Sequence, residues 1–355
     1  MRAAVFHEPG RIEVEDVPEP SIIEDEILVR VRAASVCGTD LRISKHGHFK
    51  IPAGTRRVLG HEVAGDVVAV GPRVRGYDEG MRVTVTPNVG CGTCRFCRAG
   101  DNNMCADYEA FGISIDGGFE ELLRVPGFAL ARGNVFRIPD GLGYREAALV
   151  EPFSCCYRGQ RALGVGFEDA VLIIGAGPIG VFHLMLAKLA GARKVIVSDL
   201  APARLEAARR LGADVVVNPG EAPLAETVMA ETGGLGADVV ITAVSSAAVQ
   251  AQAVQLLATH GRLNFFAGLG SGGAAEIDTN RLHYRGLVLT GTTGSSNADY
   301  EAALRLAGEG RVDLAPLVTG VFPLERIADA MAHSASGDGM KAAIMFDGAG
   351  AHGAG

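Results

Sequence analysis

Residues 60–71 place an imidazole beside a carboxylate, in the stretch Gly60-His61-Glu62-Val63-Ala64-Gly65 that Gly71 closes. Cys37 lies upstream of this stretch, and Glu151 lies far downstream. Thiolate, imidazole and carboxylate are the ligand types of zinc sites that keep one coordination position open for chemistry. Cys37, His61 and a glutamate are therefore candidate ligands of a catalytic zinc ion.

The third ligand is open between two glutamates. Adjacent residues of an extended segment point to opposite faces, so His61 and Glu62 can share a metal only if the backbone turns there. This spacing favours Glu151 and leaves Glu62 as the alternative. Each residue also has an ordinary structural explanation, such as a buried thiol, a hydrogen-bonded histidine or a salt-bridged carboxylate. It is the combination that favours a metal.

Two polar residues after Cys37 could serve such a site. The carboxylate of Asp40 can accept a hydrogen bond from the second ring nitrogen of His61, which is the usual support of a ligating histidine. The hydroxyl of Thr39 is placed to pass on the proton of an alcohol bound at the metal. We therefore count Thr39 among the candidate catalytic residues.

A cysteine-rich lobe spans residues 88–107, where the pattern Cys-x2-Cys-x2-Cys-x7-Cys is made by Cys91, Cys94, Cys97 and Cys105. Two-residue spacers let thiolates converge on one tetrahedral ion, at about 2.3 Å from zinc. Four protein ligands leave no position for a substrate, so we expect a structural zinc that stabilises a lobe with little apolar material of its own. An iron–sulfur cluster is the competing metal group, and disulfides are disfavoured in a reducing compartment.

A nucleotide-binding pattern occupies Gly175-Ala176-Gly177-Pro178-Ile179-Gly180, after a strand-like run and at the start of a helix-like one. Asp199 follows about 20 positions later, which completes the context of a dinucleotide fingerprint. Gly175 permits the tight turn, Gly177 lets the backbone approach the pyrophosphate, and Gly180 lets helix and strand pack closely. The free N–H groups at the helix start face the phosphates. This whole segment is therefore a candidate cofactor site.

Asp199 and Arg204 bear on which dinucleotide is bound. The Asp199 carboxylate would accept hydrogen bonds from the ribose hydroxyls and repel a 2′-phosphate, which favours NAD over NADP. Arg204 could help to hold the ribose, but it could also compensate a 2′-phosphate. The alternative is a glycine turn of an α/β fold that binds no dinucleotide.

The elements that position these residues change character along the chain. Up to about residue 150, short β-rich runs separated by Pro and Gly predict a β-dominated module. From Ala170, apolar strand-like runs alternate with helix-like segments, which predicts a doubly wound parallel sheet. After about Gly294 we expect the chain to return to the first module. The expected strands are 3–6, 11–17, 27–33, 63–70, 81–86, 171–174, 194–198, 215–217, 238–244, 262–266, 287–291, 317–322 and 341–346, and the expected helices are 153–163, 178–189, 202–211, 223–231, 247–258, 299–306 and 324–333.

The predicted fold class is thus α/β, with two domains. Residues 1–152 and 295–355 form the catalytic domain, which includes the lobe 88–107, and residues 153–294 form the nucleotide-binding domain. The glycine-rich tail 348–355 is expected to be disordered.

Composition excludes several classes of function. The 355-residue chain carries a net charge of −8, which argues against nucleic acid as its main partner. No apolar run approaches the roughly 18 residues of a membrane span, and polar residues appear too early for a signal peptide. The chain has seven cysteines, and four of them are crowded together, which favours metal binding in a reducing compartment. We expect Cys155 and Cys156 to be buried thiols. We expect a cytoplasmic protein without a membrane partner.

Taken together, these motifs resemble the zinc-containing medium-chain dehydrogenase/reductase family over essentially the whole chain. The pattern Gly60-His61-Glu62-x2-Gly65-x5-Gly71-x2-Val74 fits the zinc signature of that family at every fixed position. The stretch Cys37-Gly-Thr-Asp40, the four-cysteine lobe and the glycine segment occur in the family's order. Glu151-Pro152 resembles the polyol (sorbitol-like) and threonine dehydrogenase branch, because many alcohol dehydrogenases carry a cysteine there.

The resemblance implies a GroES-like catalytic domain, a Rossmann domain and a homodimer or homotetramer. It implies two zinc ions per subunit, one of them on Cys37, His61 and either Glu62 or Glu151, which can exchange places. The implied reaction transfers a hydride from a secondary alcohol of a polyol or sugar-alcohol-like substrate to NAD. The alternatives are an L-threonine or sugar-alcohol-phosphate substrate, a zinc-free type of reductase, and an NADH-binding protein without turnover.

Two positions depart from this family pattern. Arg42 stands where many relatives carry a histidine that completes a proton relay. Protons could leave instead through Thr39 and the ribose, or through His46 or His48, and an arginine at this position could bind an anionic substrate. Residues 290–293 lack the Arg-Tyr pair that sorbitol dehydrogenases use for the polyol, which speaks against sorbitol itself.

Overall fold

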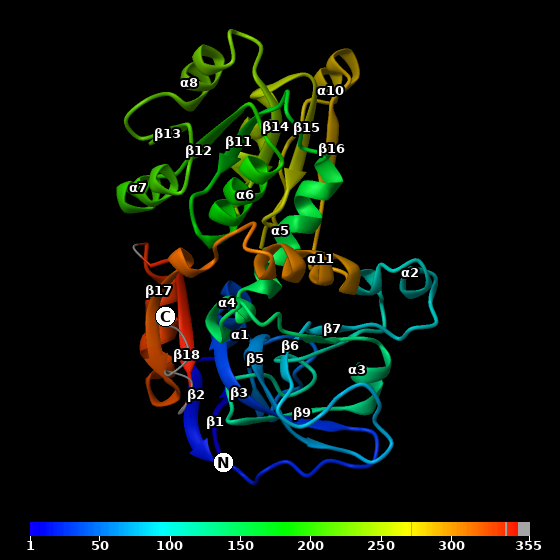
Figure 1. The fold of residues 1–355 in the computed structure, drawn as a ribbon. Helices are drawn as coiled ribbons and strands as arrows, with labels where there is room; N and C mark the ends of the chain where they lie inside the picture. The colour runs from blue at the N-terminus through cyan, green and yellow to red at the C-terminus, as the bar shows by residue number, and fades with distance from the viewer. Residues whose placement is uncertain (271, 338, 347–355) are drawn as a thin grey trace. The chain divides into compact units, whose positions relative to one another are not determined.

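The computed structural model describes residues 1–270, 272–337 and 339–346. They form two compact units (Figure 1). The first unit contains Met1–Ser154 and the chain from Gly294 onward, and the second contains Cys155–Thr293. Near the end of the described chain, β18 (Lys341–Met345) pairs with β3 (Ile27–Ser35). The prediction for the tail 348–355 falls outside the described residues.

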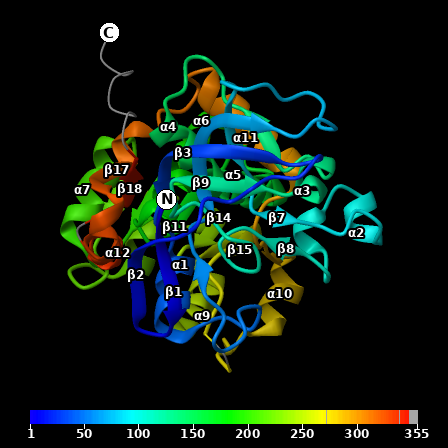
Figure 2. The ribbon, with the colours of Figure 1, turned by 90° about the horizontal axis from the view of Figure 1, so that it is seen from below.

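A seven-stranded sheet is the frame of the first unit, with the order β10-β6-β5-β3-β18-β17 and with β9 paired to β3. Figure 2 shows β9 alongside β3 when the molecule is seen from below. Alternate residues of β3 point into the core. Ile27, Val29 and Val31 are buried there, while Arg30 between them is exposed. The remaining strands of this sheet are β5 (Glu62–Val70), β6 (Arg82–Val85), β9 (Leu122–Val125), β10 (Val135–Arg137) and β17 (Val318–Pro323).

Smaller elements surround this frame. A three-stranded sheet has the order β2-β1-β4, and a two-stranded sheet joins β7 to β8 in the cysteine-rich lobe. The short helices α3 and α4 and the strands β9 and β10 were not expected from the sequence. The bounds are β1 (Arg2–Glu8), β2 (Arg11–Asp16), β4 (Arg57–Val58), β7 (Asn88–Val89), β8 (Glu109–Ala110), α1 (Gly38–His46), α2 (Arg95–Arg98), α3 (Gly127–Ala131), α4 (Tyr144–Ala148), α11 (Asn297–Gly308) and α12 (Ile327–Ala335).

The second unit contains a six-stranded parallel sheet with the order β13-β12-β11-β14-β15-β16. Both of its faces are covered, since Val171 and Ile173 of β11 join one apolar cluster and Leu172 and Ile174 join another. This is the order of a doubly wound dinucleotide-binding fold. Its strands are β11 (Ala170–Ile174), β12 (Lys194–Ser198), β13 (Val215–Val217), β14 (Ala237–Thr242), β15 (Leu257–Phe265) and β16 (Val288–Gly291).

The helices of this unit follow the predicted alternation, with one addition and one shift. Helix α10 forms after Asp278, whose side chain accepts a hydrogen bond from the Asn280 N–H, and no element was expected there. Helix α9 ends at Gln255 because β15 already begins at Leu257. None of the described helices is long and apolar enough to cross a membrane. The helix bounds are α6 (Pro178–Leu189), α7 (Pro202–Arg210), α8 (Leu224–Glu231), α9 (Ala247–Gln255) and α10 (Thr279–Arg285). Helix α5 (Val150–Leu163) begins in the first unit and continues into the second.

Candidate metal and cofactor sites

The buried carboxylate of Asp40 joins the start of α1 to the turn before β5. Its Oδ2 accepts a hydrogen bond from the backbone N–H of Cys37 over 2.9 Å. Its Oδ1 accepts from the N–H of Gly60 over 3.2 Å. Because Cys37 is the cap residue directly before α1 and Gly60 directly precedes His61, these two bonds hold the thiol and the imidazole in one place.

His61 is buried and lies against the same carboxylate. Its Nδ1 is 3.3 Å from Asp40 Oδ1, but the two atoms are not aligned as a hydrogen bond. Burial lowers the pKa of His61, yet the negative charges of Asp40 and Cys37 outweigh burial and hold that pKa well above its usual value. The surroundings of His61 therefore favour a positive charge, which a metal cation would supply in place of the proton.

Cys37, His61 and Glu62 each place a ligand atom within 4.8 Å of the other two. The structure thus differs from the spacing argument that favoured Glu151. The reason is that Gly60 turns the chain with a φ of +86° and β5 begins only at Glu62, so His61 precedes the extended run. One sulfur, one nitrogen and one oxygen donor at this separation fit a zinc ion that keeps an open position.

Lys341 is the residue of this site that the sequence analysis missed. Its Nζ donates to both carboxylate oxygens of Glu62, at 2.7 and 2.5 Å, and to the carbonyl oxygen of Val36 at 2.8 Å. The two charged side chains are only 5% and 0% exposed. Burial lowers the pKa of Lys341, but the negative charges of Glu62, Cys37 and Glu151 together outweigh burial, and the net pKa is above its usual value. The available signal was a lysine that opens an otherwise apolar strand.

Glu151 and Thr39 lie near this group without joining it. Glu151 is buried in the first turn of α5, outside the group of three ligand atoms. Burial lowers the pKa of Lys341, and the Glu151 charge is the weakest of those that raise it, after Glu62 and Cys37. Thr39 is half-buried in the first turn of α1, two residues after Cys37.

The four cysteines of the lobe converge as their spacing predicts. The sulfur atoms of Cys91, Cys94, Cys97 and Cys105 all lie within 4.8 Å of one another, and all four are free thiols. A tetrahedral zinc would bring them to about 3.8 Å, from Zn–S bonds of about 2.3 Å.

Backbone N–H groups already point at these sulfur atoms, as a thiolate cluster requires. The N–H of Cys94 donates to Cys91 Sγ over 3.3 Å, and the N–H of Cys97 donates to Cys94 Sγ over 3.5 Å. Hydrogen bonds, first of all from Thr93, lower the pKa of Cys91 to about 6. The donor set fits a closed structural metal site, while the thiol–thiol separations show no disulfide.

The three glycines of the nucleotide-binding segment are explained in three different ways. Gly175 has a φ of +108°, which favours glycine. A Cβ on Gly180 would lie 1.7 Å from the carbonyl oxygen of Gly175, so close helix–strand packing requires its absence. Gly177 has an ordinary φ of −69°, and a Cβ there would meet only the tip of Arg204, at 3.7 Å. The chain itself therefore gives no reason for glycine at position 177, which fits a ligand that approaches the backbone there.

Asp199 follows β12 and supports the same loop. Its Oδ2 accepts from the N–H of Ala176 over 2.7 Å, and its Oδ1 accepts from the N–H of Ala201 over 2.9 Å. Gly177 is also the residue that precedes the first turn of α6, where Pro178 and Ile179 begin the helix. The segment from Gly175 to Gly180, Asp199 and Arg204 are thus brought together at the carboxyl ends of β11 and β12, which is where this fold binds dinucleotides.

Comparison with known proteins bears on this geometry. Residues 178–309 match the zinc-binding dehydrogenase family, and residues 23–140 match the GroES-like domain of alcohol dehydrogenases. A sorbitol dehydrogenase of Bacillus subtilis is 33% identical over 93% of this chain and 92% of its own length. An L-threonine 3-dehydrogenase of Pseudoalteromonas translucida is 32% identical over 96% of this chain and 97% of its own.

A solved structure shares the fold along the whole chain. A zinc-binding dehydrogenase of Sinorhizobium meliloti 1021, solved with bound NADP, is 30% identical, with a TM-score of 0.90 over 97% of this chain and 99% of the other. The predicted fold class, with one GroES-like and one Rossmann part, is confirmed. The chain belongs to the zinc-containing medium-chain dehydrogenase/reductase family, in the branch of the polyol and threonine dehydrogenases, and is a zinc-dependent oxidoreductase.

Proposed function

We propose that this protein oxidises a secondary alcohol whose neighbouring carbon carries a second polar group, with NAD as the hydride acceptor. The observation that carries the proposal is the meeting of Cys37, His61 and Glu62 ligand atoms within 4.8 Å. The similar sorbitol and threonine dehydrogenases have substrates of this kind in common, since each holds a hydroxyl beside another hydroxyl or an amino group. A polyol or sugar alcohol is the proposed substrate class.

We propose distinct roles for the residues of the first unit. Cys37, His61 and Glu62 hold the catalytic zinc, and Glu151 replaces Glu62 in part of the cycle or acts through water. When bound, zinc acidifies a substrate hydroxyl and the nicotinamide accepts the hydride. Thr39 receives the hydroxyl proton at its Oγ1 and passes it outward.

Two further sites complete the proposal. Cys91, Cys94, Cys97 and Cys105 hold a second, structural zinc, so that each chain binds two ions. Residues 175–180, with Pro178 and Ile179 at the helix start, hold the pyrophosphate, and Asp199 and Arg204 hold the adenosine ribose. Asp199 favours NAD by repelling a 2′-phosphate, although a similar dehydrogenase was solved with NADP, so both cofactors belong in the test.

The test is NADH or NADPH formation by zinc-loaded protein with a panel of polyols, inositols, L-threonine and simple secondary alcohols. We expect turnover with one vicinal polar alcohol, a preference for NAD, and loss of turnover after chelation. Equal rates with simple secondary alcohols would contradict the substrate class. Undiminished turnover in protein stripped of zinc would contradict the metal assignment and favour the zinc-free reductase.

An anionic alcohol is the second candidate substrate, and it rests on Arg42. This side chain is exposed and makes no ion pair or hydrogen bond with any described residue. It lies on the same face of α1 as Thr39, three residues earlier. Burial, and after it the charge of Arg42, lowers the pKa of His48. Arg42→Ala should raise KM for a sugar-alcohol phosphate at least tenfold. The exposed Lys45 of the same helix supplies the control, Lys45→Ala. An unchanged KM in Arg42→Ala would remove this candidate.

We further propose a division into a catalytic domain, residues 1–152 and 295–355, and a nucleotide-binding domain, residues 153–294. The free state of all seven cysteines supports a cytoplasmic location. A homodimer or homotetramer is supported by β16, an edge strand on which Val288 is 55% exposed. Sedimentation velocity would test the assembly, and a monomer at micromolar concentration would contradict it.

A further inference from the structure

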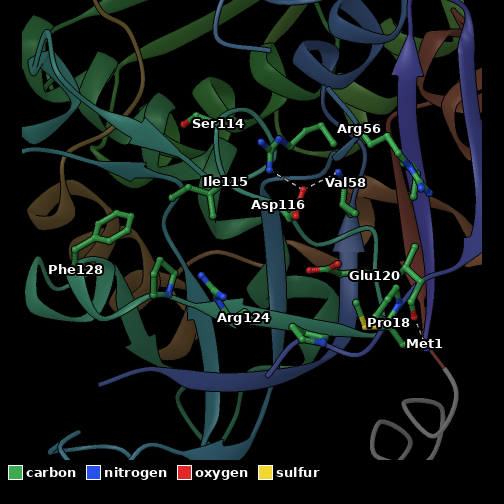
Figure 3. Close-up of a pocket in the computed structure, with 15 residues that line it drawn as sticks. Met1, Pro18, Arg56, Val58, Ser114, Ile115, Asp116, Glu120, Arg124 and Phe128 are labelled. Carbon is green, nitrogen blue, oxygen red and sulfur yellow. Dashed lines mark hydrogen bonds and ion pairs between the residues drawn. The ribbon is translucent and has the colours of Figure 1, made fainter. Parts of the chain in front are cut away.

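The first unit contains a cavity of about 510 Å³ that the proposed dehydrogenase chemistry does not use. Figure 3 shows the residues around it, which come from the start of the chain, from β4 and from the segment that leads into α3. None of the candidate zinc ligands lines it. Its size is that of a small-molecule site, for which roughly 300–1,000 Å³ is usual.

The carboxyl group of Glu120 faces this cavity. The residue is only 4% exposed, and no described residue makes a hydrogen bond or ion pair with its carboxyl oxygens. Burial and the nearby Asp116 raise the pKa of Glu120 well above its usual range, although Arg57 opposes them. The group is therefore held toward its neutral form, in which it can donate a hydrogen bond. The carboxyl oxygens of Glu120 are not sealed off from the cavity, so a ligand in the cavity can form hydrogen bonds with them.

The remaining charges around the cavity are mostly positive. Arg56, Arg57, Arg124 and the amino group of Met1 line it, together with the carboxyl groups of Asp116 and Glu120. Arg56 is already paired with Glu15, which lies outside the lining. Asp116 is already paired with Arg57 over 2.7 Å. Arg124 is held only loosely, with its Nε 3.5 Å from Glu26, and its side chain is 51% exposed. Arg124 is thus the cation most available to an incoming anion.

The other half of the cavity wall is apolar. In Figure 3, Phe128 and Ile115 lie on one side of the cavity, and the carboxyl group of Glu120 lies on the opposite side, with Arg124 between them. Phe128 is 46% exposed, which is unusual for a phenylalanine that has a core beside it. A matching ligand would combine an anionic head with an apolar body.

We propose that this cavity binds a small organic carboxylate, whose head meets Glu120 and Arg124 and whose apolar body packs on Phe128. A carboxylate accepts two hydrogen bonds side by side, so it can take one from the Glu120 carboxyl and one from the guanidinium of Arg124. A cationic ligand would instead face the guanidinium of Arg124, while Arg56 and Arg57 already occupy the nearby carboxylates of Glu15 and Asp116. The site is separate from the proposed dehydrogenase site and does not depend on it.

The sequence offers a specific reporter, because it contains no tryptophan. Phe128→Trp places a single indole at the cavity wall, in zinc-loaded full-length protein. We expect its fluorescence to respond saturably to hexanoate, with a dissociation constant of about 1 mM or tighter, and not to hexanamide or hexylamine. Phe167→Trp is the matched reporter, since Phe167 is 80% exposed and lies in the other unit, and it should not respond.

Variants in the Phe128→Trp background assign the contacts. Arg124→Ala should weaken hexanoate binding about tenfold or more, the effect of losing a hydrogen bond to a charged group. Arg73→Ala is the control, because Arg73 is also an exposed arginine paired to a glutamate of the same loop, at 3.1 Å from Glu24. Glu120→Gln keeps a donor and should bind within about threefold, whereas Glu120→Ala should bind about tenfold less well.

Three results would overturn the proposal. These are a response to hexanamide as strong as that to hexanoate, hexanoate binding that Arg124→Ala leaves unchanged, and no saturable response of Phe128→Trp. A fold check by circular dichroism accompanies Glu120→Ala. Arg124→Ala changes an exposed side chain, so it keeps the test decisive even where Glu120→Ala fails to fold.

Discussion

Replacing Lys341 by methionine tests how the buried carboxylate of Glu62 is held. The three hydrogens of the ammonium are all used, on both oxygens of Glu62 and on the carbonyl of Val36. Methionine keeps most of the length of the side chain but removes every donor and the charge. Because the pair is 5% and 0% exposed, water cannot replace the lost partner.

The expected loss follows from that burial. Removing one partner of a buried ion pair usually costs about 3–5 kcal/mol, because the other charge is left uncompensated. Lys341→Met should therefore lower the free energy of unfolding of zinc-free protein by about 3–5 kcal/mol. Lys341→Met combined with Glu62→Gln should regain most of that loss, since no buried charge remains. In zinc-loaded protein the loss should be smaller, because the metal compensates Glu62.

The assay is urea unfolding followed by tryptophan fluorescence in a Phe128→Trp background, with and without chelator. The indole reports on the first unit, which matters because two units need not unfold in one transition. A loss below about 1 kcal/mol in both metal states would refute the reasoning. So would a double variant that is no more stable than Lys341→Met, because the ion pair would then not be the cause.

Three further predictions rest on other parts of the structure. Gly177→Ala should weaken NADH binding at least tenfold, as measured by calorimetric titration. It should leave the thermal unfolding temperature unchanged, because the added Cβ meets only Arg204, at 3.7 Å. An unchanged affinity for NADH would remove the dinucleotide assignment. In metal analysis, Cys94→Ser should hold one zinc ion per chain fewer than the wild type. The control is Cys155→Ser, which changes a thiol outside both clusters and should keep all the zinc. Equal zinc content in the two variants would count against the structural site. Burial lowers the pKa of His183 to about 3, so the folded protein keeps this ring neutral while the unfolded chain takes up a proton below about pH 6.5. Lowering the pH from 7 to 5 should therefore cost the wild type about 2 kcal/mol more stability than His183→Gln, and parallel urea-unfolding curves for the two proteins would contradict this.

The second unit was largely predictable because its information is local. Each apolar strand is followed by a helix of matching period, and the expected bounds of β12 and β13 agree with the structure to the residue. Helix α10 was missed because its bounds are set by the Asp278 side chain and by Gly286, which ends it in the left-handed conformation, rather than by an apolar period.

The candidate metal site was only partly predictable, because its decisive contacts join distant residues. The four-cysteine cluster followed from spacing alone. The meeting of His61 and Glu62 with one thiol depends on a backbone turn at Gly60, which the rule for extended strands does not anticipate. Lys341 lies 279 positions from Glu62, so no local pattern joins them. Glu120 likewise carries no sequence signal, because its role depends on the cavity that surrounds it.

The most direct test of the central claim is the zinc content and the turnover of Cys37→Ser. The account predicts that this variant holds one zinc ion per chain where the wild type holds two, binds NADH as before, and has lost turnover on the preferred alcohol. Two zinc ions per chain together with undiminished turnover would contradict it, since the Cys37 thiol would then not be part of the catalytic metal site.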